Sequence, residues 1–182
     1  KGIVLQDIRS SRAIQECLNR YQAKVETWRV GRAYAALKLR ELDGCYGGEL
    51  AGHYYFRDFY YSDSALLAAS IVLRLLAERK KEGKTMSQII DEITPYSNSG
   101  EINFKIERKN EAMDAVREHF MSIEKPERFL DFDGYRLDYP DWWLNIRPSN
   151  TEPYLRFLCE AKSEAKLKEI IETVKGIVAQ HS

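Results

Sequence analysis

The chain has 182 residues, of which 44% are hydrophobic, so it can build one medium-sized domain or two small ones. Its 28 basic and 28 acidic residues cancel, which disfavours nucleic acid or an anionic membrane surface as a partner. The longest apolar stretch, Ala65–Ala77, contains Ser70 and Arg74 and is too short to cross a bilayer. The three cysteines lie far apart, so we expect neither a disulfide framework nor a zinc site, and a reducing cytoplasm is the expected location.

Strands and helices are predicted to alternate in the first half of the chain. In order, they are a strand at Gly2–Ile8, a helix at Ser10–Tyr21, a strand at Lys24–Val30, a helix at 33–42 and a strand at Cys45–Phe56 with a glycine-rich interruption. A long apolar helix is predicted within Asp58–Arg79, with Ser62 and Asp63 as candidate N-caps. A capping box at Thr85–Gln88 predicts a short helix through Ile93. This alternation indicates an α/β layer.

The segment Thr94–Gly100 has the composition of a turn, since Pro, Asn, Ser and Gly favour non-helical backbone. We place a domain boundary there, which gives domains at 1–97 and 98–182. The second domain is predicted to contain a strand at Glu101–Glu107, a helix at Asn110–Met121, a hairpin turn at Asp133-Gly134, strands at Tyr135–Tyr139, Trp142–Arg147 and Tyr154–Ala161, and a helix at Ser163–Ala179. This order indicates an α+β domain with one sheet covered by two helices.

The loop that follows the predicted strand Trp142–Arg147 has the donors that a phosphate requires. A guanidinium, hydroxyls and an amide occur together at Arg147, Ser149, Asn150 and Thr151. Arg156, on the next strand, could add a second charge-assisted contact. Glu152 would repel a phosphate unless it points away. For this fragment alone, a polar hairpin loop without a ligand is the alternative interpretation.

A second polar loop, Gly47–His53, has donors and acceptors suited to a sugar. Ionised Glu49 offers only acceptors, which fits two neighbouring hydroxyls, and His53 can donate. Gly47, Gly48 and Gly52 permit close approach of a ligand to the backbone. Taken alone, this loop favours a different interpretation, a glycine-rich strand connection that carries a hydrogen-bonded histidine and no ligand.

Both loops resemble motifs of the α-D-phosphohexomutase family, the phosphomannomutases and phosphoglucomutases. Gly48–His53, GELAGH, is similar to the sugar-binding loop of the third domain, with Ala51 at the usual serine. Arg147–Pro153, RPSNTEP, resembles the phosphate-binding loop of the fourth domain. Flanking segments also resemble the family: Asp7–Arg9, Val30–Arg32, Tyr54–Asp63 and Asp133–Arg136. The resemblance implies a partial three-layer α/β/α mutase domain at 1–97, N-terminally truncated, followed by an α+β, TBP-like C-terminal domain at 98–182.

The resemblance also implies roles for individual residues. Glu49 would bind the 3- and 4-hydroxyls of the sugar, and His53 the sugar or its phosphate. The phosphate that is not transferred would be held by Arg147, Ser149, Asn150 and Thr151. Arg9 and Arg32 would line the cleft, where many members have a lysine and a histidine. Ala51 cannot make the hydroxyl contact of its serine counterpart.

The activity implied is interconversion of hexose 1-phosphate and hexose 6-phosphate by intramolecular phosphoryl transfer, on mannose or glucose phosphates. The family's phosphoserine and its Mg²⁺-binding Asp-rich loop do not occur in these residues. We therefore expect no catalytic residue and no metal ligand in this chain, with Mg²⁺ and the N-terminal domains belonging to a longer parent, and no turnover by the fragment. The start at Lys1, which runs directly into an apolar segment, agrees with a truncated chain. The alternative is a non-catalytic module that binds phosphosugars or anions.

Overall fold

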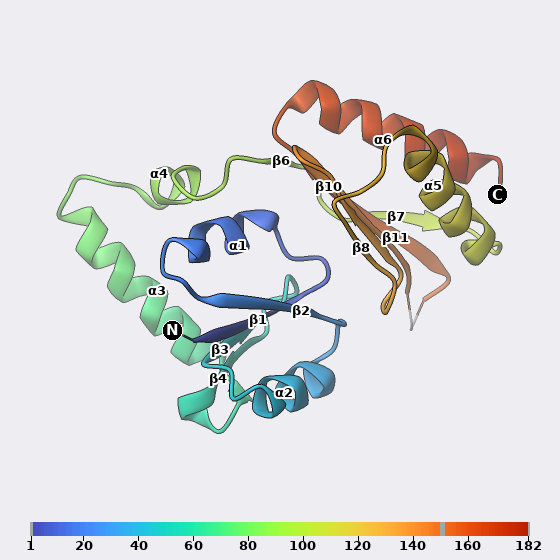
Figure 1. Cartoon of the computed structure of the whole chain (residues 1–182). Coiled ribbons are helices and arrows are strands. Elements are labelled where there is room, and N and C mark those ends of the chain that lie inside the picture. The colour runs from blue at the N-terminus through green and yellow to red at the C-terminus, as the bar shows by residue number, and fades with distance from the viewer. Residues whose placement is uncertain (1, 150–151, 182) are drawn as a thin grey trace. The chain divides into compact units, whose positions relative to one another are not determined.

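A computed structural model of the protein describes residues 2–149 and 152–181 (Figure 1). The chain divides into two compact units, Lys1–Pro95 and Tyr96–Ser182, each with its own sheet. The predicted fold class is confirmed, because the first unit is an α/β layer and the second is an α+β domain. The two units are described separately below.

The first unit is built on a five-stranded sheet. Its elements are β1 (Ile3–Asp7), α1 (Arg12–Asn19), β2 (Lys24–Trp28), α2 (Arg32–Glu41), β3 (Tyr46–Gly48), β4 (Tyr54–Phe56), β5 (Ser62–Asp63), α3 (Ala65–Lys80) and α4 (Met86–Asp91). The strand order is β2-β1-β3-β4-β5, with β1 parallel to β2 and β3 and the remaining pairs antiparallel. The β1–α1–β2 and β2–α2–β3 crossovers run in opposite directions across the sheet. Right-handed crossovers therefore place α1 and α2 on opposite faces, as Figure 1 shows.

The core of the first unit lies between the sheet and α2. Leu5 of β1 and Tyr55 of β4 point to this face and pack with Ala35 and Leu39 of α2. Leu39 and Tyr55 are both 0% exposed. Because side chains alternate along a strand, the neighbours of Leu5 and Tyr55 point to the other face, beside α1.

The long helix of the first unit begins later than predicted. Its N-cap is Ser64, whose hydroxyl accepts from Leu67 N, so the prediction of Ser62 or Asp63 as the cap is wrong. Tyr60 and Tyr61 have positive φ, and such left-handed residues interrupt a helix. Ser62–Asp63 instead pairs with β4 as a short strand. The capping box at Thr85–Gln88 is confirmed.

The second unit has an antiparallel sheet of order β6-β11-β10-β9-β8, with β7 also paired to β11. Its elements are β6 (Ser97–Asn98), β7 (Ile102–Lys105), α5 (Lys109–Ile123), β8 (Arg128–Leu130), β9 (Tyr135–Asp138), β10 (Trp142–Pro148), β11 (Tyr154–Ala161) and α6 (Glu164–Ala179). β6 lies inside the segment predicted as a turn, because Ser97 and Asn98 pair with the end of β11. The two helices pack on one face of the sheet, as predicted (Figure 1).

The two faces of the second sheet differ in chemistry. Alternate residues of β10 and β11, including Leu144, Ile146 and Phe157, pack against α5 and α6. Full burial of each such side chain contributes about 1.5–3 kcal/mol. The intervening residues point to the opposite face, which is rich in polar side chains: Arg136, Asn145, Arg147, Arg156 and Glu160. The phosphate-loop arginines therefore lie on the face opposite the helices.

Candidate functional site

The Gly47–His53 loop connects β3 to β4 and forms a tight turn. Glu49 N donates to His53 O at 2.9 Å, and Gly52 N donates to Glu49 O at 3.0 Å. Gly52 has a φ of 86°, which favours glycine. Leu50 N donates to the carboxylate of Asp7 at the end of β1, at 3.1 Å. The loop is thus fixed both by its own backbone and by the neighbouring strand.

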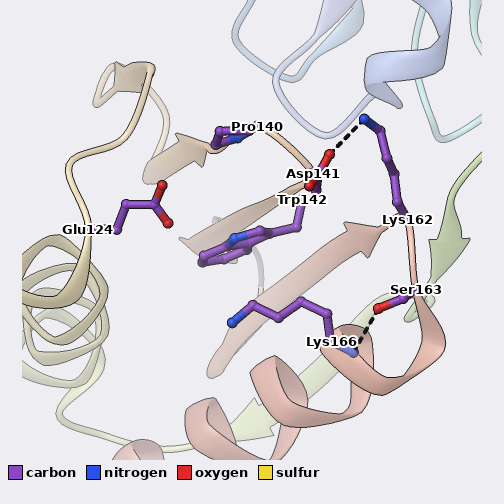
Figure 2. A pocket seen from close by; sticks show the side chains of 7 residues that line it. All are labelled: Glu124, Pro140, Asp141, Trp142, Lys162, Ser163 and Lys166. Atoms are coloured by element: carbon purple, nitrogen blue, oxygen red, sulfur yellow. Dashed lines mark hydrogen bonds and ion pairs between the residues drawn. The ribbon is translucent and has the colours of Figure 1, made fainter.

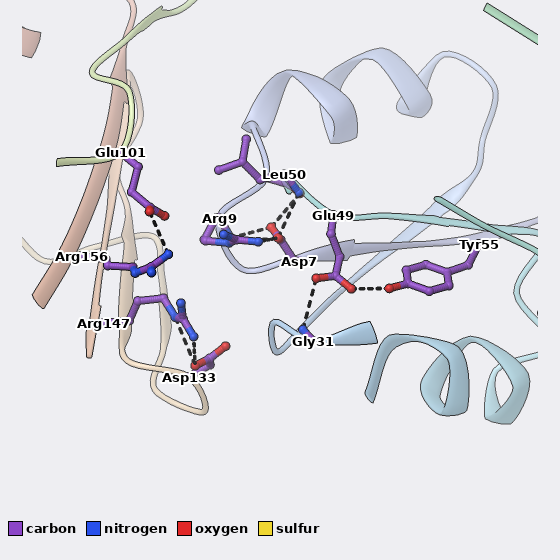
Figure 3. Close-up of polar contacts among 11 residues, drawn as sticks. Asp7, Arg9, Gly31, Glu49, Leu50, Tyr55, Glu101, Asp133, Arg147 and Arg156 are labelled. Carbon is purple, nitrogen blue, oxygen red and sulfur yellow. Dashed lines mark hydrogen bonds and ion pairs between the residues drawn. The ribbon is translucent and has the colours of Figure 1, made fainter. Parts of the chain in front are cut away.

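Glu49 is held as a buried carboxylate. Tyr55 donates its hydroxyl to Glu49 Oε1 at 2.5 Å, and Gly31 N, at the start of α2, donates to Oε2 at 3.2 Å (Figure 3). Glu49 is 6% exposed. Each carboxylate oxygen can accept a second hydrogen bond, so Glu49 keeps one acceptor position per oxygen for a ligand hydroxyl. Sequence reasoning missed Tyr55, because only the β3–β4 pairing brings it to Glu49.

Burial raises the pKa of Tyr55, and its hydrogen bond to the Glu49 carboxylate raises it further. We expect Tyr55→Phe to lower the free energy of unfolding by about 1.5–3 kcal/mol at pH 7, since it removes a buried charge-assisted hydrogen bond. The unfolded chain loses the phenol proton near pH 10 while the folded chain keeps it, so this contribution falls as pH rises above about 10.

Urea unfolding of both proteins at pH 7 and pH 11 measures this difference. Tyr55→Phe should lose less stability between the two pH values than the parent. Burial also raises the pKa of Tyr46 and Tyr139 to about 12, but both residues are present in the two proteins, so their contribution cancels in the comparison. Tyr21→Phe is the control, because the Tyr21 side chain is 72% exposed. An identical alkaline loss in Tyr55→Phe and the parent would contradict the assignment.

His53 is oriented by a carboxylate. Its Nδ1 lies 2.6 Å from Asp63 Oδ2, and Tyr54 N donates to Oδ1 of the same side chain. Burial alone would raise the pKa of Asp63, but the hydrogen bonds from Tyr54 and His53 and the charges of His53 and Arg32 outweigh burial and lower it. The ionised Asp63 therefore fixes Nδ1–H, which leaves Nε2 of the half-exposed ring available to a ligand.

Arg9 and Arg32 both lie near this loop, in different settings. Arg9 is buried and ion-paired with Asp7, its Nη2 lying 2.6 Å from Oδ2. Because Asp7 also binds Leu50 N, one carboxylate connects Arg9 to the loop (Figure 3). Arg32 is the first residue of α2, and its positive charge acts to lower the pKa of Tyr55 and of Asp63. Ala51 is exposed at the turn of the loop.

Arg147 of β10 is buried and held by a carboxylate. Its Nε and Nη2 both donate to Asp133 Oδ1 at 3.3 Å (Figure 3). Gly134, with a φ of 70°, allows this approach, because a Cβ there would lie 2.4 Å from Arg147 Cβ. Asp133 accordingly orients the guanidinium, a role that sequence reasoning did not assign.

Ser149 follows at the end of β10 and is also buried. Its N–H donates to Tyr154 O at 2.8 Å and closes the hairpin, so its hydroxyl is the donor that remains for a ligand. Asn150 and Thr151, the other predicted phosphate-binding residues, lie outside the described residues.

Arg156 faces Arg147 directly across the β10–β11 pair, so the two guanidinium groups extend from the same face. Arg156 is bound by two carboxylates: Nη1 donates to Glu101 at 3.0 Å and Nη2 to Glu152 at 2.7 Å. Glu152, which would repel a phosphate, is thereby engaged by Arg156. Among the ion pairs of the described residues, Arg147 has one carboxylate partner, Asp133, whereas Arg156 has two. The positive charge of Arg156 is therefore more fully neutralised, and Arg147 is the better candidate to bind a phosphate.

Within residues 2–149 and 152–181, no group of three or more His, Cys, Asp or Glu side chains is arranged to hold a metal ion. In the same part of the chain, no helix has the length and apolar character needed to span a bilayer.

Comparisons with known proteins match both units. Residues 1–96 match the family described as phosphoglucomutase/phosphomannomutase, alpha/beta/alpha domain III, and residues 101–177 match its C-terminal domain. A phosphomannomutase of Methanocaldococcus jannaschii is 34% identical over 177 residues, which cover 97% of this chain and 38% of that protein. A phosphomannomutase of Escherichia coli is 34% identical over 153 residues, covering 81% of this chain and 32% of that protein.

The fold has solved counterparts. The crystal structure of a phosphoglucomutase/phosphomannomutase family protein from Burkholderia thailandensis superposes with a TM-score of 0.79 at 22% identity, over 99% of this chain and 38% of that one. The chain thus spans less than two fifths of the length of these relatives. The chain belongs to the phosphoglucomutase/phosphomannomutase family, and it comprises the domain III and C-terminal domain regions of that family.

Proposed function

We propose that this chain is the substrate-recognition part of a phosphohexomutase that interconverts hexose 1-phosphate and hexose 6-phosphate. The observation that carries the proposal is the hydrogen bonding of Glu49. Tyr55 and Gly31 fix the orientation of its carboxyl group, which retains an acceptor on each oxygen, as two adjacent sugar hydroxyls require. The relatives named phosphomannomutase support a mannose phosphate as substrate, and the family description, which includes phosphoglucomutase, supports a glucose phosphate.

Each loop takes a different part of the substrate in this proposal. Glu49 accepts from the 3- and 4-hydroxyls, while His53 contributes Nε2 to the sugar or its phosphate. Arg147, oriented by Asp133, donates to the phosphate together with the hydroxyl of Ser149. Asn150 and Thr151 complete the phosphate loop, and Arg156 supplies positive charge beside it. In the first unit, Arg9 and Arg32 supply positive charge beside the Gly47–His53 loop. Ala51 has no hydroxyl, so the sugar lacks the contact that the serine at this position makes in the usual family loop.

Catalysis belongs to the complete protein in this proposal. The phosphoserine and the Mg²⁺ that stabilises the transferring phosphoryl group are supplied by N-terminal domains of the same polypeptide, in the cytoplasm. Phosphoryl transfer depends on positioning and charge neutralisation, so a chain that recognises substrate without these groups binds it and does not turn it over.

An NMR titration of the 182-residue chain tests this proposal. Inorganic phosphate should shift the Ser149 amide, and glucose 1- and 6-phosphates should shift Ser149 together with the amides of 47–53. Phosphorus NMR of the same samples with Mg²⁺ should show no interconversion. Unphosphorylated glucose is the control for non-specific sugar effects. Shifts at Ser149 alone with every phosphate would contradict sugar recognition and favour an anion-binding module, and measurable interconversion would contradict the assignment of catalysis to other domains.

A further inference from the structure

Helix α3 is apolar on every side, and yet it is mostly exposed. Between residues 65 and 77, only Ser70 and Arg74 are polar. All residues of α3 are described by the structure, and of these only Ala68 is buried. Leu66 and Leu73 are 86% and 64% exposed. A helix that is hydrophobic all round is normally buried. Helix α3 therefore has the character of an internal helix that lacks its neighbours.

An apolar groove lies beside α3, on the sheet face that also carries α1. We call it the α1–α3 groove. It consists of three cavities that share Tyr46. One, of about 390 Å³, lies between Tyr54 and Phe56 of β4 and Val72 of α3. The other two, of about 300 and 360 Å³, extend along β1 and α1 past Ile14.

The register of the strands shows that the groove floor is a single sheet surface. Val4 pairs with Tyr46, and Tyr46 pairs with Phe56, so these three side chains lie side by side on one face. Parallel strands such as β1 and β3 are normally covered on both faces. Here α2 covers one face, and α1 and α3 leave the groove between them on the other.

The lining of two of the three cavities favours an apolar occupant. The cavities bounded by Val72 and by Cys17 have no charged side chain in their linings. The third cavity extends to the Gly47–His53 loop and is lined by Glu49 as well as by Gln6. Gln6 is 4% exposed and donates to Thr27 Oγ1 at 3.4 Å. Its Oε1 has no hydrogen-bond partner among the described residues, and buried acceptors of this kind are rare in complete structures. An occupant with a donor side chain would satisfy it.

We propose that the α1–α3 groove holds an apolar helix from the part of the full-length protein that precedes residue 1. The relatives are more than twice as long as this chain, and residues 101–177 match the family's C-terminal domain, so the additional length of the relatives lies before the first unit. Gly2 lies against Cys45 at the start of β3, and Val4 already lines the groove. A segment that precedes β1 reaches the groove through a short connection. The same polypeptide, and not a second copy or another protein, is therefore the occupant.

Photo-crosslinking in the full-length protein identifies the occupant directly. A benzophenone amino acid replaces Val72, which faces the groove, or Ser70, which lies on the opposite side of α3, as the matched control. We expect Val72 to yield a crosslink within one chain, to a peptide that precedes residue 1, and Ser70 not to yield this crosslink. A crosslink between two copies, a crosslink to a peptide within 1–182, or no crosslink at Val72 would overturn the proposal.

Hydrogen exchange provides a second readout that requires no substitution. Amides of residues 69–79 are expected to exchange about tenfold or more slowly in the full-length protein than in the 182-residue chain, because packing on the groove raises the free energy of local opening. Amides of α6, in the second unit, are the internal reference. Equal exchange of α3 in the two proteins would overturn the proposal.

Discussion

Gly134→Ala is expected to lower the free energy of unfolding of the second unit by about 2–5 kcal/mol. Gly134 has a φ of +70°, where a Cβ costs about 1–2 kcal/mol. The added Cβ would also lie 2.4 Å from Ile146 O and from Arg147 Cβ. Both atoms belong to the central strand β10, so relief requires a shift of the strand, and overpacking of this kind costs about 1–3 kcal/mol more.

Gly100→Ala is the matched control for this measurement. Gly100 lies in the same unit with a φ of +64°, and a Cβ there meets no atom within 4 Å. We expect it to lose only the cost of the backbone conformation, about 1–2 kcal/mol. Urea unfolding monitored by the far-UV circular dichroism of the two variants and the parent gives both values. Equal losses in the two variants would show that close packing against β10 is not the reason for glycine at position 134.

Much of the fold could be predicted from local patterns. The capping box at Thr85–Gln88 and the alternating apolar residues of β10 and β11 are signals within a few residues of the chain, and both were interpreted correctly. The start of α3 was placed wrongly because Ser62, Asp63 and Ser64 are all acceptable caps by residue type. The left-handed backbone at Tyr60 and Tyr61 and the pairing of Ser62–Asp63 with β4 decided between them, and neither is visible in the local sequence.

In the candidate site, too, features that depend on the local sequence were predicted, and features that depend on strand pairing were not. Residues that offer chemistry to a ligand, such as Glu49 and Arg147, were predicted because their types and spacing suit hydroxyls and phosphate. The residues that orient them were not predicted, because strand register brings them into contact. Tyr55 reaches Glu49 through the β3–β4 pairing, and Asp133 reaches Arg147 because Gly134 allows close approach. Asp63 was taken for a helix cap, although its carboxylate binds His53.

Arg147→Met is expected to weaken binding of glucose 6-phosphate and of inorganic phosphate by about 10- to 100-fold, since a charge-assisted hydrogen bond contributes about 1.5–3 kcal/mol. The substitution removes the guanidinium and leaves the Asp133 carboxylate near the loop, which adds repulsion. Isothermal titration of the 182-residue chain measures both ligands. Circular dichroism of the variant checks that the loss of the ion pair has not unfolded the second unit.

Arg156→Met separates the role of Arg147 from a general effect of positive charge. Both substitutions remove one arginine from the same face of the sheet, at directly paired positions of β10 and β11. Arg156 is already engaged by Glu101 and Glu152, so its removal should weaken phosphate binding by less than about threefold. A large loss in both variants would indicate that the ligand displaces Glu101 or Glu152 from Arg156. A small loss of phosphate affinity in both variants would mean that Arg147 stabilises the hairpin through its ion pair with Asp133 and does not bind phosphate.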